Sequence, residues 1–249
     1  MEFKSGPIKF QVGARPRNAA ADRAQLEAIQ ARLAADDLEG AVALAERALA
    51  GGLEHPMTFN LAAGKLEAED RYEEAVSLLQ RGHRTWPQDL GLRQALALSL
   101  VRLQRYELAL PHFDALIAAQ PDFAPAHAAR GAVLEALHRH DAAEAAFRRA
   151  HELQPKNLLA ISGLASAAIR GGRYDEARAY AAEVLAAEPG YPEAVTVLAR
   201  ADLAQGLYDA GEARLTALIA DPRAAESQRD FARKLLDDFA QERTRKFDA

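Results

Sequence analysis

Apolar residues recur along the chain at intervals of three and four, and this pattern is interrupted at regular points. In residues 124–157, one apolar stretch covers 131–137, a polar break follows at 138–141, and a second stretch covers 143–150 before Pro155. Such spacing predicts amphipathic helices. Proline ends the second helix because it lacks a backbone N–H and its predecessor avoids the helical region. The pattern therefore predicts a helix, a turn, a helix and a stop.

The same unit returns every 34 residues. Prolines keep this interval at Pro87, Pro121, Pro155 and Pro189. A column of small residues keeps it at Ala41, Ala75, Ala109, Ala143, Ala177 and Gly211. A third column, mostly aromatic, opens the second helices at Leu38, Tyr72, Tyr106, His140, Tyr174 and Tyr208. Because one helix pair cannot bury its apolar face alone, a repeat of this length predicts a stack of helical hairpins.

These units resemble the tetratricopeptide repeat family. The A-x3-F…P ending of its 34-residue unit is matched by Ala109, Phe113 and Pro121 and by Ala143, Phe147 and Pro155. The unit that ends at Pro87 has Leu79 in the aromatic position, and the family's tryptophan near the start of the first helix is missing from every unit. The resemblance implies an all-α fold, a right-handed superhelical solenoid of antiparallel helix pairs.

We expect three parts along the chain. Residues 1–21 form an N-terminal tail outside the repeats, residues 22–223 form six helical hairpins, and residues 224–249 form a capping helix and a C-terminal tail. In the last part, residues 225–241 place apolar side chains on one helical face, at Phe231, Leu235, Leu236 and Phe239. Such a helix is typical of the solvating cap that covers a terminal repeat.

The N-terminal tail carries a short strand-like pattern. Residues 7–12 alternate apolar and polar side chains, with Ile8, Phe10 and Val12 on one side. We expect these three residues to dock on the first repeats or in the groove of another copy, so the tail offers a route to self-association.

Composition narrows the function classes. The 249 residues include 58 alanines, which favour helices, and no cysteine, which excludes disulfides and thiolate metal sites. A net charge of −5 argues against nucleic acid and anionic membranes as partners. The sequence has no apolar run long enough for a signal-peptide core or a membrane span, so we expect a cytoplasmic protein. Its 25 arginines against 6 lysines indicate a bacterial source.

Candidate chemistry is sparse. His138 and His140 form the densest histidine pair, but His140 falls in the aromatic column and His138 in the turn before it. Paired carboxylates such as Asp175-Glu176 stand at helix starts, where their negative charges interact favourably with the helix dipole and stabilise the helix. General acid–base catalysis requires two carboxyl groups in different environments, which exposed helix starts do not provide. We therefore expect no metal site, no cofactor and no catalytic site, and hence no enzyme.

The resemblance places the binding surface on the first helix of each hairpin, which lines a concave groove in this family. When the lining positions of the family are carried over to this sequence, they imply a groove of mostly short side chains, with an apolar strip and several arginines. Neither the carboxylate clamp nor the asparagine ladder of better-known members is present. The predicted partner-binding residues are Asn60, Gln94, Leu98, Val101, Arg102, Ala128, Glu135, Leu159, Ser162, Ser166, Ile169, Arg170, Thr196 and Arg200.

This groove favours a protein-interaction scaffold that binds a peptide or an amphipathic helix of a partner protein. An alternative is the substrate-recognition arm of a larger bacterial enzyme, of the glycosyl-, sulfo- or hydroxylating kind, whose catalytic part lies outside this chain. RNA binding would require basic, base-reading pairs at the same slots of every unit, which are missing. The small groove residues also have a purely structural explanation, since they permit tight packing.

Overall fold

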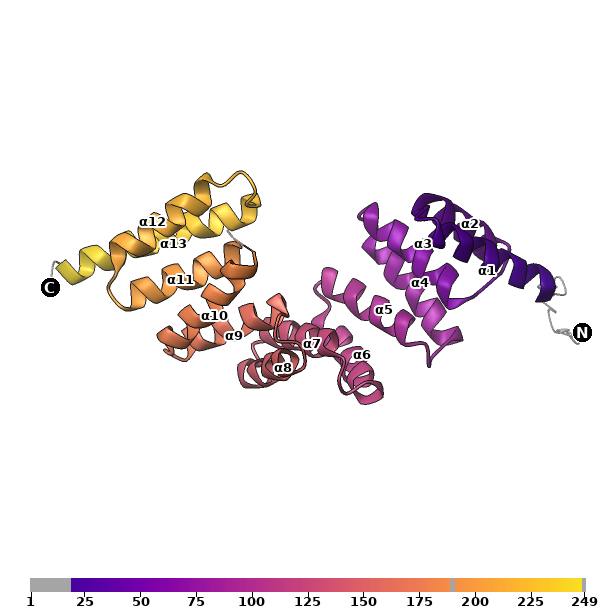
Figure 1. The fold of residues 1–249 in the computed structure, drawn as a ribbon, viewed down its shortest axis with the longest axis horizontal. Coiled ribbons are helices and arrows are strands. Elements are labelled where there is room, and N and C mark those ends of the chain that lie inside the picture. Colours follow the sequence, from indigo (N-terminus) through magenta and orange to yellow (C-terminus); the bar gives the residue numbers. More distant parts are fainter. Residues whose placement is uncertain (1–18, 189–190, 248–249) are drawn as a thin grey trace, which may run out of the picture. The chain divides into compact units, whose positions relative to one another are not determined.

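The computed structural model describes residues 19–188 and 191–247, and this part of the chain consists of helices without strands (Figure 1). The all-α prediction is confirmed. Consecutive helices form six hairpins followed by one longer helix. Their bounds are α1 Ala19–Ala34, α2 Leu38–Ala50, α3 Pro56–Ala68, α4 Tyr72–Thr85, α5 Leu90–Arg102, α6 Tyr106–Ala119, α7 Ala124–Ala136, α8 His140–Leu153, α9 Leu158–Arg170, α10 Tyr174–Ala187, α11 Pro192–Ala204, α12 Tyr208–Ala220 and α13 Glu226–Phe247.

Two helix bounds differ from the sequence prediction. Helix α1 begins at Ala19, before the expected start of the first repeat at residue 22. Helix α13 continues to Phe247, beyond the predicted end at residue 241, although no apolar periodicity follows Phe239. Arg243 supports this extension, because its guanidinium pairs with Asp209 at the start of α12. The docking predicted for Ile8, Phe10 and Val12 lies outside the described residues.

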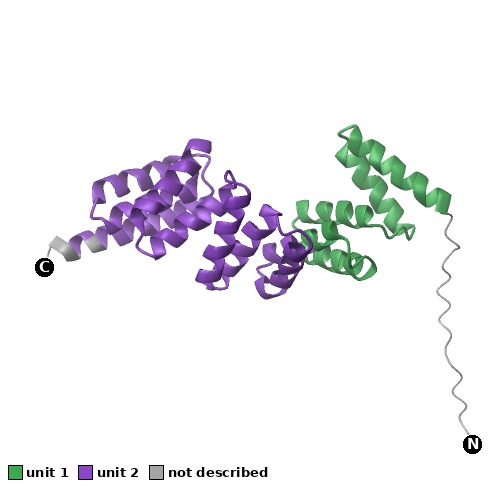
Figure 2. Cartoon of the chain, turned by 60° about the horizontal axis from the view of Figure 1, so that its bottom comes forward, with its two compact units in different colours: residues 1–95 green, residues 96–249 purple. Residues whose placement is uncertain are grey.

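The chain divides into two compact units, residues 1–95 and residues 96–249 (Figure 2). The boundary falls inside α5, where the 34-residue repeat continues without a break. We refer to them as unit 1 and unit 2.

In unit 1, α1 and α2 enclose a small core around Ile29, Ala41 and Ala45. The next hairpin places the fully buried ring of Phe59 in α3 against Gly82 in α4, where an added β-carbon would lie 2.8 Å from the ring. The glycine therefore makes room for an aromatic ring. This local fit follows from the alternation of large and small residues in the repeat.

In unit 2, the first helices α7, α9 and α11 pack beside one another, and each also packs against a second helix. Phe147 of α8 is the central large residue of one core cluster. Its ring lies between Gly131 in α7 and Gly163 in α9, since a β-carbon at either glycine would come within 2.7 Å or 2.5 Å of ring atoms, respectively. Gly131 and Gly163 therefore leave the space that the Phe147 ring fills.

Helix α13 closes the end of unit 2. Its buried Phe239 contacts Gly211 of α12 and belongs to a cluster with Ala199, Leu215 and Ala232. Leu235 and Leu236 are partly buried against the same cluster. The predicted six repeats and capping helix are thus present in the described residues.

One residue in the turn of every hairpin adopts a left-handed backbone. The φ angles lie between 55° and 77° at these positions, and the non-glycine members are Asp36, Asp70, Gln104 and His138. Their equivalents in the last two hairpins are Gly172 and Gly206, each 34 residues further along. This conformation ends the first helix and costs an L-residue about 1–2 kcal/mol. His138 therefore has a structural position in the turn.

This column yields a prediction about stability. Gly172→Ala should lower the free energy of unfolding by about 1 kcal/mol, because alanine is strained at a φ of 70°, whereas Gln104→Gly should raise it by a similar amount. Gly64→Ala is the matched control, since Gly64 is inside α3 and its new β-carbon would meet nothing within 4 Å. That control should stabilise the protein by about 0.5–1 kcal/mol. Urea unfolding followed by circular dichroism at 222 nm measures all three. Equal effects of the two Gly→Ala changes would contradict the assignment.

Candidate functional site

The first helices of unit 2 carry most of the predicted partner-binding residues. Helix α9 exposes Leu159, whose accessible fraction is 45%, and leaves Ser162 and Ser166 half-buried. Helix α11 adds Thr196 and Arg200, which are also half-buried. We call the surface of α7, α9 and α11 formed by Glu135, Leu159, Ser162, Ser166, Arg170, Thr196 and Arg200 the first-helix face.

Two predicted partner-binding residues are in the core. Ala128 is 1% exposed and packs in the cluster around Phe147, while Ile169 is 8% exposed and packs between α9 and α10. The prediction of an accessible side chain is wrong for both. Ala128 occupies the same repeat position as Ser162 and Thr196, but its single methyl group does not reach past its neighbours. The apolar strip is correspondingly shorter than the sequence suggested.

The other predicted residues are distributed over both units. In α5, Leu98 and Arg102 are exposed and Val101 is half-buried, and all three belong to unit 2. Asn60 and Gln94 belong to unit 1 and are half-buried.

Glu135 and Arg170 bind each other across the first-helix face. Arg170 donates from its two terminal nitrogens to the two carboxylate oxygens of Glu135, at 2.5 Å and 3.0 Å. The Nδ1 atom of His140 lies 3.4 Å from the same carboxylate. This bidentate pair joins α7 to α9 and neutralises both charges. Among the described residues, no group of three or more potential metal ligands lies together.

A pocket of about 300 Å³ lies at the α13 end of the first-helix face. Ser166 comes from α9, Thr196 and Arg200 come from α11, and α13 contributes Gln228 and Phe231. Phe231 is 50% exposed, although the sequence pattern assigned it to the buried side of the capping helix. The burial of Phe239 fixes the rotation of α13 and leaves Phe231 at the pocket.

Arg200 differs from Arg170 in that it forms no ion pair within the part of the chain that the structure describes. Among the described residues, its guanidinium forms no ion pair or hydrogen bond, whereas Arg170 pairs with Glu135. Burial, followed by the charge of Arg170, lowers the pKa of Arg200 from its usual value. The pocket therefore contains a partly desolvated positive charge.

A second carboxylate in unit 2 was not singled out from the sequence. Asp202 of α11 is buried and pairs with Arg178 of α10 at 2.5 Å and with Arg214 of α12 at 2.9 Å. It stands in a repeat column that is apolar in the four preceding units, at Leu66, Leu100, Leu134 and Ala168. A carboxylate among these apolar residues is the sequence feature that could have identified Asp202. Asp202 links three helices and has a structural role.

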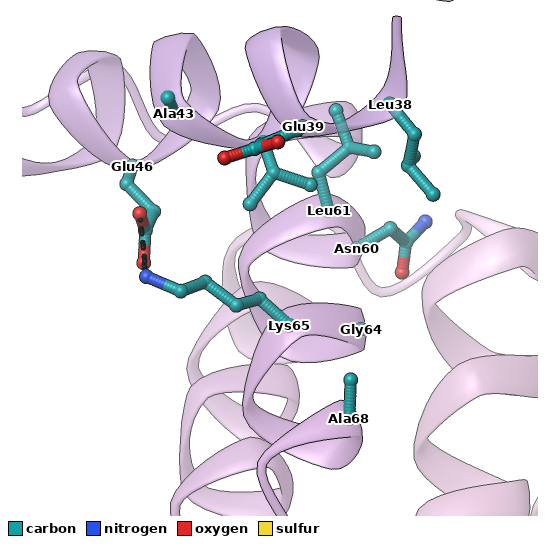
Figure 3. A pocket seen from close by; sticks show the side chains of 10 residues that line it. Leu38, Glu39, Ala43, Glu46, Asn60, Leu61, Gly64, Lys65 and Ala68 are labelled. Atoms are coloured by element: carbon teal, nitrogen blue, oxygen red, sulfur yellow. Dashed lines mark hydrogen bonds and ion pairs between the residues drawn. The ribbon is translucent and has the colours of Figure 1, made fainter. Parts of the chain in front are cut away.

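Unit 1 has a larger pocket, of about 660 Å³, between α2 and α3. Its apolar wall comes from Leu38, Val42 and Leu61, and the predicted Asn60 lies beside it (Figure 3). Lys65 pairs with Glu46 at 2.9 Å, and this hydrogen bond raises the pKa of Lys65. Figure 3 marks the pair with a dashed line. Sequence reasoning missed the α2 wall, because it considered first helices only.

Family models for the tetratricopeptide repeat match residues 95–157, 134–185 and 168–235. Together they cover residues 95–235, which is more than half of the chain. The chain belongs to the tetratricopeptide repeat family. A search of curated proteins gave no match. The family prediction is confirmed, and tetratricopeptide repeat proteins are generally non-catalytic scaffolds that bind other proteins.

Solved structures show the same fold at low sequence identity. A tetratricopeptide repeat protein from Parabacteroides merdae is 17% identical, with a TM-score of 0.68 over 90% of this chain and 88% of that one. PilW, a type IV pilus biogenesis factor, is 18% identical, with a TM-score of 0.69 over 86% of this chain and 99% of its own. MamA from Desulfovibrio magneticus RS-1 is 19% identical, with a TM-score of 0.58 over 68% of this chain and 96% of its own.

Among the described residues of this tetratricopeptide repeat chain, no helix is both long enough and apolar enough to span a membrane.

Proposed function

We propose that this tetratricopeptide repeat protein is an interaction scaffold that binds a peptide or an amphipathic helix of a partner protein along the first-helix face of unit 2. The observation that carries the proposal is the exposed Leu159 amid short polar side chains. Ser162, Ser166 and Thr196 are half-buried, and Ser166 and Thr196 line the pocket at the α13 end of the face. An apolar side chain with open space around it offers a partner an anchor point.

The exposed Leu98 and Arg102 of α5 and the half-buried Val101 extend the proposed surface within unit 2. Asn60 and Gln94 are proposed as contacts within unit 1. Glu135 and Arg170 contribute through their mutual ion pair, so an incoming segment meets a neutral, hydrogen-bonded pair at that position.

The test compares two leucine substitutions. Leu159→Glu should abolish capture of the partner from a lysate, because it places a charge where an apolar side chain must bind. Leu108→Glu is the matched control, since Leu108 is 56% exposed but lies on the second helix α6. Bound proteins are compared by mass spectrometry, and a photo-crosslinking residue at position 162 identifies the bound segment. Loss of the same proteins with both variants, or with neither, would contradict the proposal.

A further inference from the structure

The arginines of unit 2 differ in how their charges are balanced. Arg170 shares two hydrogen bonds with Glu135, while Arg178 and Arg214 share the buried carboxylate of Asp202. Arg200 is half-buried in the pocket between α9, α11 and α13 and has no such partner among the residues the structure describes.

A half-buried guanidinium without an ion-pair partner is energetically unfavourable. Removing a charge from water costs free energy unless an opposite charge or hydrogen-bond acceptors replace the lost solvation. Arg170 adds a second positive charge nearby, which lowers the pKa of Arg200 further. An anionic group in the pocket would supply the missing acceptors and form a charge-assisted hydrogen bond.

The remaining walls select among anions. Glu193 lines the pocket, and its carboxylate accepts a hydrogen bond from the Gln228 side chain at 3.2 Å. Its negative charge favours a ligand group with a single negative charge over a doubly charged phosphate. Thr196 donates its hydroxyl to the carbonyl of Pro192 at 2.8 Å, so its hydroxyl proton is already engaged. Phe231 provides an exposed aromatic wall for an apolar neighbour of the anion.

We infer that this pocket binds the carboxylate of an aspartate or glutamate side chain in the partner segment, with Arg200 as its counter-charge and Phe231 in contact with an adjacent apolar side chain. The inference rests on the proposed function and names the chemistry of the partner at one end of the first-helix face. It also gives α13 a second role, because the capping helix supplies the aromatic wall of the pocket.

The experiment selects peptides from a library of displayed random 12-residue sequences against the intact chain. Enriched sequences should contain aspartate or glutamate beside an aromatic or aliphatic residue. A synthetic peptide of this type is then titrated by fluorescence anisotropy. Replacing its acidic residue by the corresponding amide should weaken binding to the unaltered protein about tenfold or more. With Arg200→Gln, the same change in the peptide should have little effect, because the counter-charge is already gone.

Two further variants serve as controls. Arg200→Lys keeps the charge and should retain part of the affinity, while Arg233→Gln removes one exposed positive charge from α13 outside the pocket and should change affinity less than twofold. Circular dichroism checks that every variant is folded. Equal losses in the Arg200→Gln and Arg233→Gln variants would reduce the effect to net charge and overturn the inference.

The outcomes separate the two proposals. Enriched peptides that lose binding with Leu159→Glu but are insensitive to Arg200→Gln would overturn this inference alone. Tighter binding of a phosphoserine peptide than of its aspartate counterpart would overturn the choice of a carboxylate. Failure to enrich any peptide would count against both the inference and the proposed function.

Discussion

Replacing Phe147 by alanine is expected to lower the free energy of unfolding of unit 2 by about 3–5 kcal/mol. The ring is buried between Gly131 of α7 and Gly163 of α9. It fills the space that a side chain at either glycine would otherwise occupy. Alanine would leave a cavity bounded by helices that cannot collapse onto it without shifting the repeat. Urea unfolding followed by circular dichroism at 222 nm gives the difference.

The same contact can be disturbed from the glycine side. Gly163→Ala should cost about 1–3 kcal/mol, because its β-carbon would lie 2.5 Å from the Phe147 ring. Leucine occupies this repeat position at Leu79 and Leu215, so Phe147→Leu in the Gly163→Ala background should recover part of the loss. This double-mutant cycle isolates the contact. Strictly additive costs would show that the two residues do not interact as the structure indicates.

Phe239→Ala is expected to cost about 3–5 kcal/mol and to release α13 from the end of unit 2. Phe239 is fully buried against Gly211 and is the largest side chain of the core cluster between α12 and α13. Because α13 also supplies Gln228 and Phe231 to the Arg200 pocket, the same variant should weaken binding of an acidic peptide. Thermal unfolding and peptide anisotropy measure the two effects.

Phe231→Ala provides the matched control on the same helix. Phe231 is half-exposed, so its removal should change the free energy of unfolding by less than about 0.5 kcal/mol while still reducing peptide affinity. The pair therefore separates the structural and binding roles of α13. If Phe231→Ala destabilised the protein as strongly as Phe239→Ala, the orientation of α13 described here would be wrong.

The repeat made most of the fold predictable. Helix pairs, the prolines that end them and the small and large columns follow from spacing alone, because each hairpin reuses the same local packing. The two-unit division within α5 had no such signal, since the 34-residue interval continues through Ala95 and Leu96. The left-handed backbone of the hairpin turns is shared by Gln104, His138, Gly172 and Gly206, and because only two of these are glycines, residue type did not reveal it.

The candidate site was less predictable, because position in a repeat does not fix the accessibility of a side chain. Ala128 shares its column with Ser162, yet it is buried because its side chain is too short to reach the surface. Asp202 was overlooked because the same position is apolar in the units directly before it. Its two arginine partners come from the helices before and after α11. In both cases the neighbours from other hairpins decide the outcome.

The sequence by itself determined the helical hairpin, its number of copies and its family, since these depend on local periodicity and on residues within one unit. Only the tertiary structure decided which charges are balanced. Arg170 and Arg200 are both predicted groove arginines, but Arg170 forms an ion pair with Glu135 of the preceding hairpin, whereas Arg200 forms none among the described residues. Charge balance depends on distances between helices that lie far apart along the chain, and the repeat period does not specify those distances.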